Sequence, residues 1–283
     1  MKPSIELVAV DIDGTLLNNE YLMSERNEKV LKEAIDQGIK IILATGKTYA
    51  SAKLIIERLE LKTPGIYNQG LTVYKSDGTL DYQKILDPEI ARQVITFAED
   101  RGFSMVAYSG NRLLARTINP DTEQFHSKYH EPMPDVVGPL QNILGEIPIN
   151  KILAVKTGEP KKITALRWQL DKQLNGKIQM TQALPHMLEV LPPGNSKGAA
   201  LKTLLKQMNV DAKHVMAIGN AENDIGMLEL AGVSVVVGNA TQMLKDVADH
   251  VVADNDKDGV AEAIEKFVLA DSNIPAAATS LDK

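Results

Sequence analysis

Four short runs rich in apolar residues stand out along the chain, each followed by glycine or polar residues. They are LVAV (7–10), KIILA (40–44), VMAI (215–218) and VSVVV (233–237). Apolar runs of this length, without alternation, are typical of strands covered on both faces in a parallel sheet. The pattern therefore predicts four strands of one buried sheet.

Helical patterns lie between these strands. Each carries apolar residues at spacings of three and four, and the predicted ranges are 24–37, 48–60, 196–208 and 221–230. Ser24 and Ser196 are good N-cap residues, and Gly38 is a typical helix stop. Strands that alternate with helices imply right-handed crossovers, so we predict an α/β fold with a Rossmann-like open parallel sheet.

The middle of the chain has a different pattern. Short strand-like runs such as FSMVAY, RLLART, KILAVKT and HMLEVL accompany predicted helices at 88–101 and 160–174, and the Pro-rich stretch 119–139 is predicted to be irregular. Such a mixture favours an α+β domain with an antiparallel sheet. The predicted organisation is therefore a core formed by 1–82 and 188–283, with an inserted α/β cap domain formed by 83–187. The tail after Phe267 is expected to be disordered.

Composition narrows the classes of function. The 283 residues are 44% hydrophobic and 24% charged, with a net charge of −6, which argues against a nucleic-acid partner or a polybasic membrane-surface role. The absence of cysteine excludes disulfides and thiolate metal sites. The sequence has no apolar stretch of the length of a membrane span and no secretory leader pattern, so we expect a cytoplasmic protein without a membrane partner.

Polar residues follow three of the four predicted strands directly. The first strand runs into DIDGT (11–15), the second into Thr45-Gly46-Lys47, and the third into Gly219-Asn220. Because ligands bind at the carboxyl ends of strands in open parallel sheets, we expect these groups to converge on one site.

The pair Asp11 and Asp13 allows two interpretations. Asp-x-Asp-Gly by itself is about as consistent with a solvated turn as with a site. A carboxylate at the end of a buried strand is costly without a cation, which favours a hard cation such as Mg²⁺ with oxygen ligands. A carboxylate can also attack phosphorus, while the Thr45 hydroxyl and the Lys197 ammonium are suitable groups for a phosphoryl site.

Taken together, these motifs resemble the haloacid dehalogenase superfamily of phosphatases. DIDGTL, Thr45, Lys197 and GNAEND are similar to its four ordered motifs, and the insertion resembles the cap of the Cof-type branch. NQG (68–70) and LPPGNSKGAAL are similar to further stretches of that branch. The resemblance covers residues 5 to about 268.

The resemblance implies a role for each motif residue. Asp11 would be the nucleophile and a metal ligand, and Asp13 the general acid and base with its backbone carbonyl on Mg²⁺. Thr45 and Lys197 would bind the phosphoryl oxygens, and Lys197 would also restrain Asp11. Gly46 and Asn223 are further candidates for phosphate binding.

The metal site of the resemblance would be completed by Asn220 and Asp224. The family usually has Asp where this chain has Asn220, and Arg where it has Lys47. An amide oxygen can ligate Mg²⁺ without adding charge. We favour Asn220 as the direct ligand, because it follows its strand as Asp11 does, with Asp224 supplying charge from behind.

The resulting hypothesis is a Mg²⁺-dependent phosphatase that hydrolyses small phosphate monoesters, such as sugar phosphates or phosphorylated cofactors. Its partner would be a small phosphorylated metabolite, and the sequence does not indicate an oligomeric state. One alternative is a phosphomutase or phosphotransferase with the same nucleophile. Another is a degenerate ligand-binding or regulatory protein with a weakened metal site, although the intact pair Asp11 and Asp13 argues against it.

Overall fold

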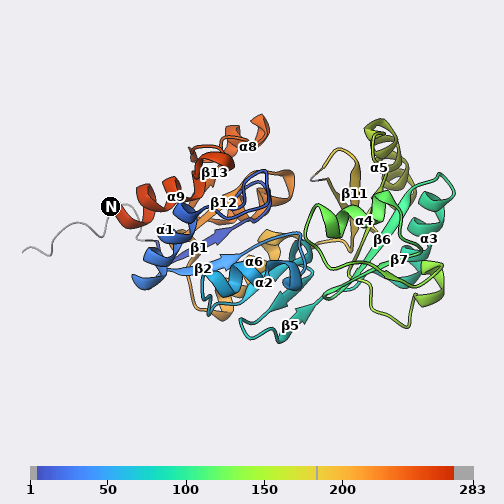
Figure 1. The fold of residues 1–283 in the computed structure, drawn as a ribbon, viewed down its shortest axis with the longest axis horizontal. Helices are drawn as coiled ribbons and strands as arrows, with labels where there is room; N and C mark the ends of the chain where they lie inside the picture. Colours follow the sequence, from blue (N-terminus) through green and yellow to red (C-terminus); the bar gives the residue numbers. More distant parts are fainter. Residues whose placement is uncertain (1–4, 183, 271–283) are drawn as a thin grey trace, which may run out of the picture.

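The computed structural model describes residues 5–182 and 184–270, whose strands form three sheets (Figure 1). The largest part of the core is a parallel five-stranded sheet. In spatial order its strands are β14 (His250–Val251), β13 (Val233–Val236), β12 (Val215–Gly219), β1 (Leu7–Val10) and β2 (Lys40–Leu43). Four of them are the predicted strands, so the predicted α/β core is confirmed.

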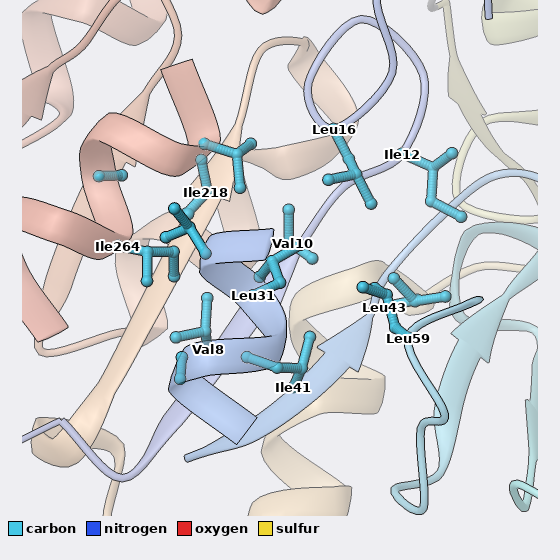
Figure 2. Close-up of a cluster of buried hydrophobic side chains, with 14 of the residues drawn as sticks. Val8, Val10, Ile12, Leu16, Leu31, Ile41, Leu43, Leu59, Ile218 and Ile264 are labelled. Atoms are coloured by element: carbon cyan, nitrogen blue, oxygen red, sulfur yellow. The ribbon is translucent and has the colours of Figure 1, made fainter. Parts of the chain in front are cut away.

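Helices cover both faces of this sheet. Alternate side chains of each strand point to opposite faces, so Val8 and Val10 lie on one face while Leu7 and Ala9 lie on the other. Figure 2 shows Val8, Val10 and Ile41 beside Leu31 and Ile264. The helices on that face are α1 (Glu25–Asp36), α2 (Tyr49–Arg58) and α9 (Gly259–Ile264), and those on the other are α6 (Lys197–Gln207), α7 (Ile225–Leu230) and α8 (Gln242–Val247).

Side-chain caps explain where the helices next to the strand ends begin. Ser24, Thr48 and Ser196 each accept a hydrogen bond from the backbone N–H three residues further on, at α1, α2 and α6. The predicted helix 221–230 is instead a 3₁₀ turn, η4 (Glu222–Asp224), followed by α7. The chain forms the tighter 3₁₀ turn at this point because the Asp224 carboxylate accepts hydrogen bonds from the backbone N–H groups of residues 220 and 221.

The second sheet has six strands and lies in the other lobe of the molecule (Figure 1). Its order is β10 (Gln179–Thr181), β11 (Met187–Leu191), β9 (Lys151–Val155), β6 (Ser104–Ser109), β7 (Arg112–Ala115) and β8 (Asp135–Val136), antiparallel except for the pair of β7 and β8. Helices α3 (Pro88–Glu99) and α5 (Pro160–Leu174) pack on one of its faces. Strand β11 runs across the boundary predicted between 187 and 188. The division into domains stays a prediction.

The structure corrects the prediction of an irregular stretch over 119–139. It contains helix α4 (Pro120–Ser127), whose first residue is proline, and a short strand, β8. Asn119 caps the helix by accepting the N–H groups of Asp121 and Thr122, and Thr122 completes a capping box. Proline at the first helical position lacks only an N–H that would have no partner there, so it starts this helix instead of breaking it.

A third, small sheet was not predicted from the sequence. It consists of β3 (Gly65–Tyr67), β4 (Thr72–Tyr74) and β5 (Leu80–Gln83), and a 3₁₀ turn, η1 (Asn68–Gly70), joins the first two strands. The other short turns are η2 (Leu140–Ile143), η3 (Ala212–His214) and η5 (Asn255–Lys257).

The predicted disorder after Phe267 is wrong for the next residues. A π-helical turn, η6 (Glu265–Leu269), continues from α9, and Val268 and Leu269 are buried in the core. The rest of the predicted tail, from residue 271 onwards, lies outside the described residues.

Candidate active site

A cavity of about 330 Å³ lies where the carboxyl ends of β1, β2 and β12 face the six-stranded sheet. Residues from both lobes line it. Those of the core include Asp11, Asp13, Gly14, Thr45, Gly46, Gln69, Asn220 and Asn223, and those of the other lobe include Tyr108, Tyr129, Lys151, Leu153 and Glu189. The three strand ends therefore do converge on one place.

Asp11 follows β1 and is almost completely buried. Its Oδ1 accepts a hydrogen bond from Lys197 Nζ at 2.6 Å, and its Oδ2 accepts one from Thr15 Oγ1 at 3.1 Å. Burial raises the pKa of the Asp11 carboxyl to about 7, and the Asp224 carboxylate adds to this rise, while the Lys197 ammonium opposes it. The carboxylate is thus fixed in orientation at the floor of the cavity.

Lys197 is the first residue of α6 and its ammonium is fully buried. It donates to Asp224 Oδ1 at 2.8 Å as well as to Asp11. Burial by itself would lower the pKa of Lys197, but the two carboxylates beside it raise the pKa above its ordinary value. The ammonium therefore stays charged behind Asp11.

Asp224 uses both of its oxygens within the protein. Oδ1 binds Lys197, and Oδ2 accepts the backbone N–H groups of Asn220 at 2.9 Å and Ala221 at 3.0 Å. These bonds fix the turn that carries Asn220. The Asn220 side chain lies against Gly14, where an added Cβ would come within 2.4 Å of its Nδ2. Gly14 also has a φ of +72°, so this position favours glycine on two counts.

Thr45 and Gly46 follow β2 and form the next side of the site. The Thr45 hydroxyl accepts the N–H of Lys47 at 3.1 Å, and the Gly46 carbonyl accepts a hydrogen bond from Lys151 Nζ at 2.8 Å. Asn223 donates through Nδ2 to Gln69 Oε1 at 3.0 Å. A lysine of the other lobe thus contacts the loop that the sequence predicts to bind phosphate.

Asp13 lies at the mouth of the site, where Lys47 Nζ approaches its Oδ1 at 3.3 Å. Lys47 is buried and also donates to the backbone carbonyl of Tyr129 in the opposite lobe. This lysine, which stands where the family usually has arginine, therefore joins the predicted general acid to the second lobe.

The face of the six-stranded sheet that points to the cavity carries a buried ion pair. Lys151 Nζ lies 3.4 Å from Glu189 Oε1 and 4.4 Å from the centre of the Tyr108 ring. Glu189 Oε2 is buried without a hydrogen-bond partner within residues 5–182 and 184–270. It is free to accept a hydrogen bond from a ligand in the cavity.

Comparisons with known proteins identify the family of the chain. The model of the haloacid dehalogenase-like hydrolase family matches residues 8–264. The chain belongs to this family. Among solved structures, a haloacid dehalogenase-like hydrolase from Bacteroides thetaiotaomicron superposes with a TM-score of 0.82 at 29% identity, covering 93% of this chain and 99% of that one.

Two curated relatives of this haloacid dehalogenase-like hydrolase differ in length. The chain is 34% identical over 277 residues to the chloroplastic endoribonuclease YBEY of Arabidopsis thaliana. The match covers 95% of this chain but only 47% of that protein, so this chain spans about half the length of that relative. A second relative is the 5-amino-6-(5-phospho-D-ribitylamino)uracil phosphatase YcsE of Bacillus subtilis. This chain is 29% identical to it over 269 residues, and the match covers 94% of this chain and 96% of that protein.

These matches confirm the resemblance that the motifs predicted, which places the chain among the Cof-type phosphatases of the superfamily. The predicted site residues are brought together in two layers. Six of them line the cavity: Asp11, Asp13, Thr45, Gly46, Asn220 and Asn223. Lys197 and Asp224 lie behind Asp11. Within the described part of the chain, no helix is long and apolar enough to cross a membrane.

Sequence reasoning missed the residues that the second lobe supplies. Lys151 and Glu189 had a weak signal, because each is a charged residue inside or beside an apolar strand. Glu131 had none, since it lies in the stretch predicted to be irregular. Its carboxylate accepts the N–H of Thr48 at 3.2 Å and the Thr48 hydroxyl at 2.7 Å, and also binds Ser51. It therefore docks on the first turn of α2 in the core.

Proposed function

We propose that the protein is a Mg²⁺-dependent phosphatase that hydrolyses small phosphate monoesters through an aspartyl-phosphate on Asp11. The observation that carries this proposal is the Asp11 carboxylate itself, which is held between Lys197 and Thr15 at the floor of the cavity. Phosphoryl transfer needs mainly positioning and neutralisation of charge, and this arrangement supplies both.

The first step is attack by an Asp11 oxygen on phosphorus. The bond from phosphorus to the ester oxygen breaks as the bond to Asp11 forms. Asp13, which lies two residues further on at the cavity mouth, gives its proton to the departing oxygen and so avoids the release of an alkoxide. Lys47, 3.3 Å from Asp13, holds this carboxyl in place.

The second step releases phosphate. A water attacks phosphorus, the bond to Asp11 breaks, and Asp13 takes the proton of the water, so that both carboxyl groups return to their initial states. Thr45, the backbone N–H of Gly46, Lys197 and Asn223 are the candidates for binding the phosphoryl oxygens. The second lobe covers the site and excludes bulk water.

The residues present fit a magnesium ion. The Asp11 carboxylate, the Asp13 backbone carbonyl and the Asn220 amide oxygen are hard oxygen ligands, as Mg²⁺ prefers. The Asn220 side-chain amide has no hydrogen-bond partner within the described residues, so it is available to a ligand, whereas both oxygens of Asp224 are engaged. Bound there, the ion would neutralise charge on the phosphoryl group. Asp224 would act from behind, through Lys197 and the turn of Asn220.

The size and lining of the cavity support a small organic leaving group. Next to the phosphoryl site the cavity presents aromatic and apolar side chains together with the pair of Lys151 and Glu189. The relative YcsE is named for a phosphorylated ribitylamino-uracil, which is a molecule of this kind. Phosphorylated metabolites with hydroxyl or N–H groups are therefore the proposed substrates.

The test uses purified protein and p-nitrophenyl phosphate. We expect hydrolysis that requires Mg²⁺, is abolished by a chelator, and falls about 10³-fold or more in Asp11→Asn. Asp36→Asn, at an exposed carboxylate at the end of α1, is the matched control and should keep wild-type activity. Intact-mass analysis after a rapid quench should find a phosphoryl adduct in wild type and none in Asp11→Asn.

Two results would contradict the proposal. Activity that is unchanged by chelation would remove the role of magnesium, and activity that survives Asp11→Asn would remove the nucleophile. Product analysis separates hydrolysis from transfer, because a phosphomutase or phosphotransferase would yield a second phosphorylated product in place of free phosphate.

A further inference from the structure

Gln69 has an unfavourable backbone conformation in the floor of the site. Its φ and ψ are 63° and 28°, in the left-handed region, and Asn68 before it has a φ of 50°. Residues other than glycine rarely adopt this backbone conformation. It persists where the surrounding structure enforces it, and it often marks a functional site. Two hydrogen bonds fix the Gln69 backbone: its N–H donates to the Thr45 carbonyl at 3.0 Å, and its carbonyl accepts from Asn195 Nδ2 at 2.9 Å.

These bonds join Gln69 to three loops of the site. Thr45 belongs to the loop after β2, and Asn195 comes two residues before Lys197. The Gln69 side chain reaches the third loop, since its Oε1 accepts the hydrogen bond from Asn223 Nδ2 at 3.0 Å. Gln69 thus holds the three loops in a fixed relation.

The other end of the Gln69 amide faces Gly46. The side chain is 3% exposed and lines the cavity. A Cβ on Gly46 would come within 2.5 Å of Gln69 Nε2, so the amide lies directly against the Gly46 backbone. Asn223 occupies Oε1, which directs Nε2 toward Gly46. Over residues 5–182 and 184–270, Nε2 has no hydrogen-bond partner of its own.

A ligand in the cavity could supply the hydrogen-bond acceptor that Gln69 Nε2 lacks. Gln69 lines the cavity, so a molecule bound there can reach this N–H group, and polar groups of almost buried residues are normally paired with protein, water or ligand. We propose that Gln69 Nε2 donates a hydrogen bond to a phosphoryl oxygen beside Gly46. This inference rests on the proposed phosphatase function and adds to it a neutral donor that the motif residues do not include.

The experiment is a calorimetric titration of the purified full chain with inorganic phosphate in the presence of Mg²⁺. Gln69→Met keeps the length of the side chain and removes the N–H. We expect it to weaken phosphate binding about tenfold or more, as befits a hydrogen bond to a charged group. Gln207→Met, on the exposed side of α6, is the matched control and should bind phosphate as wild type does.

A double-mutant cycle separates contact from positioning. If Gln69 binds phosphate directly, Gln69→Met weakens binding in the Asn223→Ala background as well. If Gln69 acts only by holding Asn223, the double variant binds phosphate no more weakly than Asn223→Ala, and the proposal is overturned. Unchanged affinity in Gln69→Met in the wild-type background would also overturn it.

A second variant covers the case in which Gln69→Met does not fold, as judged by circular dichroism. Gln69→Asn suits the left-handed backbone and withdraws the amide by one methylene, so it should give a similar loss. Wild type that binds phosphate through Gln69 but does not hydrolyse p-nitrophenyl phosphate would refute the phosphatase and leave this assignment standing. Wild type that binds no phosphate would refute both.

Discussion

The two large sheets contribute to one cavity in different ways. The parallel sheet presents its edge, so its polar groups come directly after strands β1, β2 and β12, and its faces are apolar. The six-stranded sheet presents a face, so its polar groups Lys151 and Glu189 stand within strands β9 and β11 among apolar neighbours. An edge gathers loop residues, whereas a face selects alternate strand residues.

The difference explains the division of labour that we propose. Loop residues at the edge can approach one point from several strands, which suits the chemistry at phosphorus. Side chains on the face form a broad wall, which suits contact with the rest of a substrate. Two buried lysines allow a direct test of this contrast: Lys197, at the start of α6 behind Asp11, and Lys151, on the face of the six-stranded sheet.

The largest difference between the two regions should appear in kcat when each lysine is replaced in turn with methionine. Lys197→Met leaves the buried carboxylates of Asp11 and Asp224 without their shared cation, so we expect kcat for p-nitrophenyl phosphate to fall about 10³-fold or more. Lys151→Met removes a cation from the wall, so kcat should fall about tenfold or less. Steady-state kinetics measures both. Equal losses in kcat would end the distinction between edge and face.

The same contrast decides how much of the site the sequence could predict. The edge residues Asp11, Thr45 and Asn220 are visible because each follows an apolar run, and strand order alone brings them together. Lys151 and Glu189 are not, because KILAVKT and HMLEVL do not tell which alternate residues face a ligand. Glu131 depends on the docking of one lobe on the other, which no local pattern encodes. In the fold, helix α4 was missed because the Pro-rich stretch 119–139 was predicted to be irregular, although proline at the first helical position is compatible with a helix.

The next effect concerns stability and compares the hydrophobic clusters of the two lobes. Leu31 of α1 and Leu166 of α5 are both buried, the first under the parallel sheet and the second under the six-stranded sheet. Substitution of either by alanine should lower the free energy of unfolding by about 2–5 kcal/mol. If the predicted domains unfold separately, calorimetry should find that each variant lowers a different transition. One transition that shifts alike in both variants would contradict the predicted division.

A smaller effect should sharpen the assignment of the metal ligands at the edge. Asn220→Asp adds a charge to the proposed ligand and should tighten Mg²⁺ binding about tenfold, whereas Asp224→Asn removes charge from behind and should weaken it. Titration calorimetry with Mg²⁺ measures both. If Asn220→Asp left the affinity unchanged and Asp224→Asn abolished binding, the two roles would be reversed.

The smallest effect tests the contact between the two regions. Burial raises the pKa of Glu131, although Lys47 and the hydroxyls of Ser51 and Thr48 oppose the rise. The folded state therefore binds a proton more tightly than the unfolded state, whose carboxyl titrates near its ordinary value of about 4.5. As pH rises above that value, this carboxyl lowers the stability of the folded protein, by at most about 1.4 kcal/mol for each pH unit.

Glu131→Gln removes this dependence while an amide can still accept the N–H of Thr48. The stability of the variant relative to wild type should therefore increase as pH rises from 5 to 7 (~2 pH units). Urea denaturation at several pH values measures the difference, with Glu123→Gln, at an exposed position of α4, as the control. Parallel pH profiles for Glu131→Gln and wild type would show that this carboxyl is no more buried in solution than an ordinary surface group. The two lobes would then not be held together through α2, because Glu131 reaches Thr48 and Ser51 only where the lobes are in contact.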